Sequence, residues 1–202
     1  MFDSRLYENL DRAAVESYNA RIAGSKSAAA YRLHDELGPH PYDGDIENAK
    51  VILLLANPGY GKTSTLDDHR YRVEGWPMSS LHPGASKGMY DWVLPKVGDL
   101  VKRFGPQHIA RYVAMAQIHP WASENFDERF SPPSKAVIAK LVKEAHQRGA
   151  IIVAGRQYAY WDSVCGTTLP RAFFRAPTLI AANIESRTPG VWAAVCKKLH
   201  ES

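Results

Sequence analysis

Residues 51–63 are the part of this chain best suited to chemistry, because an apolar run there ends in a Gly-rich turn. In α/β proteins, a turn at the carboxyl end of a buried strand is a usual place for an active site. Gly61, Lys62 and Thr63 stand in the order with which a phosphate-binding loop cradles nucleotide phosphates and magnesium. Asn57-Pro58-Gly59, just before them, can instead form a bend that presents a carboxamide. The two interpretations imply different functions.

Three further polar clusters follow apolar runs, at residues 117–123, 155–157 and 183–187. In a parallel sheet the ligand lies outside the carboxyl ends of the strands, so we expect the four clusters to form one site. A Gln amide such as that of Gln117 can donate and accept hydrogen bonds toward a ligand, or it can be satisfied by neighbouring backbone. His119 can likewise face the cleft or be a structural histidine.

The elements that would position these residues follow from the apolar spacing. Runs without alternation at residues 51–56, 112–118, 150–154 and 176–182 are typical of parallel strands covered on both faces. Helical spacing predicts helices over residues 4–23, 27–37, 90–104, 134–148 and 157–165, and from residue 189 onward. We expect Pro95 to kink or delay its helix and Gly105-Pro106 to end it. Residues 62–85 are predicted to be a long irregular loop, of the kind that is usually functional or mobile.

This order predicts a three-layer α/β/α sandwich around a central four-stranded parallel sheet. The length of 202 residues fits one α/β domain, on which residues 1–45 pack as a helical segment. A net charge of +4 permits an anionic partner such as nucleic acid without requiring one. Cys165 and Cys196 are far apart and suggest two buried thiols, with neither a disulfide framework nor a metal site. Without a long apolar segment or a signal-peptide core, we expect a cytoplasmic protein with no membrane association.

The nucleotide-binding interpretation needs a helix that opens directly from the Gly-rich turn. Residues 64–71 are polar throughout, and Gly75-Trp76-Pro77 ends the segment before an apolar stripe can form. None of the later predicted strands ends in the Asp that magnesium would need. An NTPase or kinase that uses Gly61-Lys62-Thr63 therefore remains one alternative, and a purely structural turn is another.

Taken in order, the strand ends resemble those of the uracil-DNA glycosylase superfamily, in particular its mismatch-specific and single-strand-selective branches. The first strand of those branches ends in a Gly-Ile-Asn-Pro-Gly type motif, which here reads Leu55-Ala56-Asn57-Pro58-Gly59. The resemblance covers most of residues 46–200 in element order. It implies hydrolysis of the N-glycosidic bond of uracil or a damaged base in DNA, with no cofactor and no metal.

The resemblance also implies roles for particular residues. Asn57 would position the attacking water, and Asn183 or His119 would stabilise the departing base. Gly59, Tyr60, Gln117 and Trp76 would contact the base, and Lys62, Arg156, Ser186 and Arg187 would hold DNA phosphates. The Pro-Ser pair of the family's last motif is missing after Asn183, and Glu185 would repel DNA. A nucleic-acid-binding member of the scaffold without activity is therefore a third alternative.

Overall fold

The computed structural model describes residues 3–61, 64–155, 157–166, 184 and 189–202, and in them the strands form one four-stranded sheet in the order β1-β3-β2-β4. The central strand β2 (Val51–Leu55) pairs in parallel with β3 (Val113–Gln117) and with β4 (Ile151–Ala154). The edge strand β1 (Tyr42–Asp43) pairs antiparallel with β3. The α/β prediction is confirmed, whereas the prediction of a wholly parallel sheet is wrong. The strand predicted at residues 176–182 lies outside the described residues.

The antiparallel edge strand lies between the helix predicted over residues 27–37 and the strand predicted over residues 51–56, where no strand was predicted. Tyr42 pairs with Ala116 and Asp43 with Met115, and the chain then turns at Gly44. Gly44 has φ +102°, and a Cβ at this position would lie 2.7 Å from the backbone oxygen of Val113. Only glycine fits this conformation and this close approach, so Gly44 lets the chain leave the sheet immediately after two residues.

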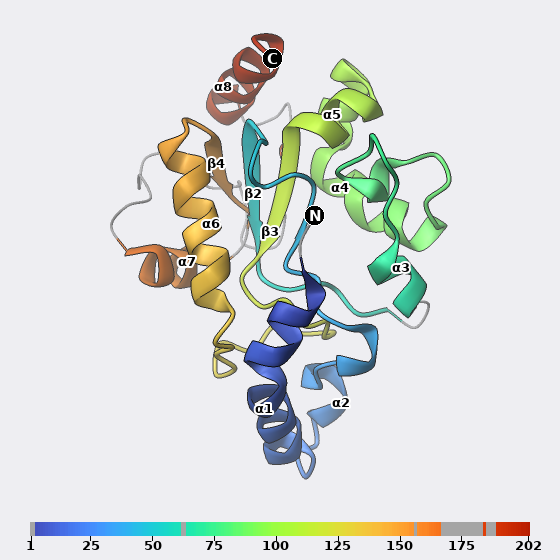
Figure 1. Cartoon of the computed structure of the whole chain (residues 1–202), viewed down its shortest axis with the longest axis vertical. Helices are drawn as coiled ribbons and strands as arrows, with labels where there is room; N and C mark the ends of the chain where they lie inside the picture. Colours follow the sequence, from blue (N-terminus) through green and yellow to red (C-terminus); the bar gives the residue numbers. More distant parts are fainter. Residues whose placement is uncertain (1–2, 62–63, 156, 167–183, 185–188) are drawn as a thin grey trace.

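Helices cover both faces of the sheet, which explains the uninterrupted apolar strands (Figure 1). One face of β2 and β3 packs against α6 (Lys135–Gln147) and α7 (Tyr158–Cys165). The other face packs against α4 (Lys87–Phe104), α5 (Pro106–Tyr112) and α8 (Pro189–His200). The described residues therefore form the expected three layers.

Four of the helices predicted from the apolar spacing are confirmed, namely α1 (Ser4–Ile22), α6, α7 and α8. In contrast to the expected delay, α4 begins at Lys87, because Ser86 caps it by accepting a hydrogen bond from Met89 N at 3.2 Å, and Pro95 lies inside it. Gly105, with φ +82°, ends α4 as expected. Pro106 then starts α5 at once, a helix that was not predicted.

The single helix predicted over residues 27–37 is wrong, because α2 (Ala28–Tyr31) and the 3₁₀ helix η1 (Asp35–Leu37) take its place. Between these two short helices, backbone groups form hydrogen bonds with residues that are distant in the sequence. The Asn19 side chain bonds both the N–H and the C=O of Leu33 at 2.9 Å, and His34 N donates to Ala122 O at 2.8 Å. The segment over residues 62–85 also holds two short helices, α3 (Leu66–Arg70) and the 3₁₀ helix η2 (Ser79–Leu81).

A buried carboxylate fastens α1 to the body of the fold. Asp11 is fully buried and accepts hydrogen bonds from Trp121 Nε1 and Ser134 N, both at 2.9 Å, and from the Ser134 hydroxyl. Trp121 belongs to the segment after β3, and Ser134 precedes α6, so one side chain joins three parts of the chain. The position also places a carboxylate at the amino end of α6, where it is favourable.

The described residues contain two free, buried thiols, Cys165 and Cys196. No described helix combines the length and the apolar character needed to cross a membrane.

We predict that Asp11→Ala lowers the free energy of unfolding by about 3 kcal/mol or more, because it leaves the Trp121 and Ser134 donors buried without their acceptor. Glu16→Ala, an exposed position on the same helix, is the control and should stay within about 0.5 kcal/mol of wild type. Urea unfolding measures both. Equal stabilities of the two variants would contradict the anchoring role.

Candidate functional site

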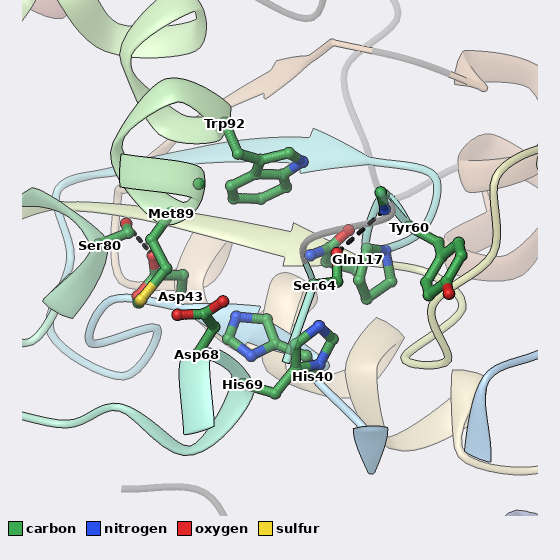
Figure 2. A pocket seen from close by; sticks show the side chains of 14 residues that line it. His40, Asp43, Tyr60, Ser64, Asp68, His69, Ser80, Met89, Trp92 and Gln117 are labelled. Carbon is green, nitrogen blue, oxygen red and sulfur yellow. Dashed lines mark hydrogen bonds between the residues drawn. The ribbon is translucent and has the colours of Figure 1, made fainter. Parts of the chain in front are cut away.

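A cavity of about 280 Å³ lies at the carboxyl ends of β2 and β3 (Figure 2). Its lining comes from four parts of the chain: the turn at residues 58–61, the end of β3 at Gln117, the start of α4, and the segment around α3 and η2. His40 and Asp43 close it from the side of β1. The site therefore lies where the sequence places the ligand of an α/β sheet.

The turn after β2 is held by Asn57. Its Nδ2 donates to Ser123 Oγ at 2.9 Å and to the backbone oxygens of Ser123 and Pro58, each at 3.0 Å. Tyr60 N also donates to Ser123 O, at 3.2 Å. The clusters after the first two predicted strands therefore meet, as expected. Asn57 itself is not among the described residues that line the cavity, and its part in positioning water stays a prediction.

Gln117 is the most informative side chain of the cavity. It is 0% exposed, and neither its Oε1 nor its Nε2 has a hydrogen-bond partner in the described part of the chain. An unsatisfied buried polar group costs about 1–3 kcal/mol, and such groups in native proteins call for an explanation. Since the side chain lines the cavity, a ligand with one donor and one acceptor side by side would satisfy both atoms.

Two aromatic rings line the cavity near this amide. The Trp92 indole comes from α4, and the Lys96 ammonium lies over the ring at 3.8 Å from its centroid. The Tyr60 ring is stacked on His34 with centroids 3.4 Å apart and planes 6° apart. His34 Nδ1 in turn is 2.7 Å from Glu36 Oε1. Both rings are thereby held in place, and they offer flat apolar surfaces to a planar ligand.

The ionisable side chains of the described lining include two histidines and two aspartates, namely His40, His69, Asp43 and Asp68. Burial lowers the pKa of both His40 and His69, with the Arg72 charge acting in the same direction, so both rings are neutral at pH 7. Burial raises the pKa of Asp43, whose carboxylate accepts a hydrogen bond from the Ser80 hydroxyl. No Lys or Arg occurs among the described lining residues. The described part of the lining therefore offers no side-chain cation to a phosphate.

Of the predicted base-contacting residues, Gly59, Tyr60 and Gln117 come together in the cavity. Trp76 does not: it lies edge-on to His82 at 5.2 Å and lines a separate hollow beside β1. Sequence reasoning missed Trp92, which it counted only as part of a helix. It also missed His40, Asp68 and His69, although the unusual length of the segment over residues 62–85 was a signal for the last two.

His119, predicted as a catalytic candidate, is a buried structural histidine. Its Nε2 lies 3.3 Å from the Tyr160 hydroxyl, and its ring contacts Phe126 and Phe130 with centroids 4.5 and 5.2 Å away. Burial in this aromatic surround lowers its pKa to about 3. His119 is not among the described residues that line the cavity, and its predicted role in stabilising the departing base stays a prediction. Lys62, Arg156, Asn183, Ser186 and Arg187 lie outside the described residues.

The phosphate-loop interpretation finds little support in the described geometry around Gly61. Gly61 N donates to Ser64 Oγ at 3.0 Å, and Thr65 is extended with φ −125° and ψ 158°. Helix α3 begins only after Thr65 and has five residues. A phosphate loop instead opens directly into a long helix whose amino end faces the anion. Within the described ranges, no cluster of three or more His, Cys, Asp or Glu could hold a metal ion.

Comparison of the chain with protein-family models, with curated proteins and with solved structures gives no match.

We predict that Asn57→Ala lowers the free energy of unfolding by about 2 kcal/mol, because three acceptors lose the donor that joins the two strand-end turns. Asn125→Ala, at an exposed position near Ser123, should change it by less than about 0.5 kcal/mol. Chemical denaturation measures both. An unchanged stability in Asn57→Ala would show that the amide is free for another role.

A second prediction concerns pH. The unfolded chain protonates His119 near pH 6.5, whereas the folded chain does so only near pH 3, so stability falls as the pH drops through this window. Between pH 7 and pH 5, His119→Gln should lose about 2 kcal/mol less stability than wild type, since a pKa difference is worth about 1.4 kcal/mol per unit. Urea unfolding at the two pH values measures this. An identical loss in both proteins would contradict a neutral buried His119.

Proposed function

We propose that the cavity receives a single base turned out of a DNA strand, and that the protein hydrolyses the N-glycosidic bond of uracil or a related damaged base. The observation that carries this proposal is the unpartnered Gln117 amide inside the cavity. A uracil edge places an N–H beside a carbonyl, and one carboxamide pairs with both atoms at once. The resemblance of residues 55–59 to the glycosylase motif is consistent with this assignment.

The shape of the cavity supports a base rather than a whole nucleotide. Its volume of about 280 Å³ is slightly smaller than that of usual ligand pockets, which range from about 300 to 1,000 Å³. Trp92 and Tyr60 provide surfaces on which a planar ring can stack, and stacking on an aromatic residue contributes about 1–3 kcal/mol per base. Trp76 was predicted to contact the base, but of the two tryptophans it is Trp92 that lines this cavity, so we assign the base contact to Trp92.

The chemistry requires charge to be stabilised at two places. As the bond from C1′ to the base lengthens, the sugar becomes cationic and the base leaves as an anion. The Gln117 Nε2–H group would donate to a base carbonyl and oppose the negative charge. In this proposal, Asn57 positions the attacking water and Asn183 is a second donor to the base. The phosphate contacts are Lys62, Arg156, Ser186 and Arg187.

The test is excision from labelled oligonucleotides that carry one deoxyuridine, single- and double-stranded, followed by alkaline cleavage. Wild type should release uracil, and Gln117→Leu should lose excision because the base edge has no partner. The same substitution should raise the free energy of unfolding by about 1 kcal/mol, since an apolar side chain removes the unsatisfied amide. This opposite movement of activity and stability separates a binding role from a structural one.

Gln107→Leu, an exposed position on α5, is the matched control and should leave excision unchanged. Excision by Gln117→Leu at the wild-type rate would contradict the proposed role of the amide. DNA binding by wild type without any strand scission would indicate a nucleic-acid binder and would overturn the proposed activity.

A further inference from the structure

Asp68 is the carboxylate of the cavity that the proposed function leaves unexplained. It lies in the first turn of α3 and is half-buried. Its backbone N–H donates a hydrogen bond to Thr65 Oγ1 at 3.1 Å, which fixes the turn. Among the described residues, its carboxylate forms no ion pair and accepts no hydrogen bond. In the view of Figure 2, Asp68 lies beside His69 and Met89, and Gln117 lies between it and Tyr60.

The surroundings of Asp68 favour a cation next to it. The described lining contains no Lys or Arg to neutralise the carboxylate, and His40 and His69 are uncharged at pH 7. In a partly enclosed site, an uncompensated negative charge stabilises positive charge more strongly than it would in water. In glycosyl transfer, the group that becomes positive is the sugar, and carboxylates are the side chains that usually face it.

We propose that Asp68 is a catalytic carboxylate of this site, acting on the sugar side of the bond while Gln117 holds the base. This role rests on the proposed glycosidic hydrolysis. The carboxylate stabilises the positive charge at C1′ and accepts a proton from the water that attacks this carbon. The bond from C1′ to the base breaks, its electron pair leaves with the base, and the proton taken up by Asp68 is returned to the base nitrogen. The products are the free base and an abasic sugar with a C1′ hydroxyl.

Two other candidates for this task are less suitable. Asp43 is fully buried and bound by the Ser80 hydroxyl, and burial raises its pKa, which favours its neutral form. Asn57 would position the attacking water, but its carboxamide cannot accept the proton that this water loses. Asp68 combines access to the cavity with a carboxylate that no described neighbour occupies.

Asp68→Asn tests the role, because it removes the charge and keeps the size and the backbone hydrogen bond to Thr65. Asp67→Asn is the matched control: Asp67 is exposed, lies in the same first turn of α3, and does not line the cavity. Single-turnover release of uracil from a deoxyuridine oligonucleotide gives the rate, and its dependence on enzyme concentration gives the affinity. Titration with free uracil, followed by tryptophan fluorescence, reports the base pocket separately.

For Asp68→Asn we expect the rate to fall by about 10²- to 10⁴-fold, the usual contribution of a general base, while the affinity for DNA and for uracil stays within about threefold of wild type. Asp67→Asn should match wild type in all three quantities. If Asp68→Asn releases uracil at the wild-type rate, the role of Asp68 is wrong and the proposed function stands. If wild type binds uracil but releases none from DNA, both the proposed function and the role of Asp68 are overturned.

Discussion

The cavity depends on the contact between Asn57 and Ser123. The parallel register pairs Leu55 with Gln117, so β2 and β3 end at the same level and their following turns leave the sheet side by side. The Asn57 amide joins these turns through two hydrogen bonds to Ser123 and donates a third to Pro58 O within its own turn. In the joined turns, Tyr60 stacks on His34 and Gly59 lies next to Trp92. Together with the backbone bonds Tyr60 N to Ser123 O and Ser123 N to Pro58 O, this amide holds the two turns that wall the cavity beside Gln117.

The apolar sheet around Gln117 offsets the free-energy cost of burying its unsatisfied amide. Gln117 is the last residue of a strand in which all five residues are buried, and it leaves two polar atoms unsatisfied. The other four residues of β3 and all of β2 are apolar and are buried between two helical layers. Burial of each methylene contributes about 0.8 kcal/mol, so the stabilisation from these two strands exceeds the cost of one unsatisfied amide. The fold tolerates the unsatisfied Gln117 amide because the apolar core around it is extensive.

Local patterns predicted the elements that are stabilised locally or by complete burial. The strands β2, β3 and β4 and the helices α1 and α6 follow from apolar runs and spacing, and Gln117 follows from its place at a strand end. What could not be predicted is set by contacts distant in sequence. The bonds of Leu33 to Asn19 break the predicted helix over residues 27–37, and Gly44 lets a two-residue edge strand pair antiparallel. Trp92 and Trp76 cannot be told apart without knowing which of them faces the strand ends.

The charge of the cavity bears on the two interpretations of residues 57–63. A nucleotide's phosphates need cations and a set of backbone donors at the mouth of a helix. The described lining offers instead the Asp68 carboxylate, the buried Asp43, whose pKa is raised, and the neutral rings of His40 and His69. A phosphate beside Asp68 would be repelled, whereas a sugar that becomes positive beside Asp68 as its base departs would be stabilised. In the proposed reaction, the Gln117 carboxamide would stabilise the negative charge on the departing base, and the Asp68 carboxylate would stabilise the positive charge on the sugar.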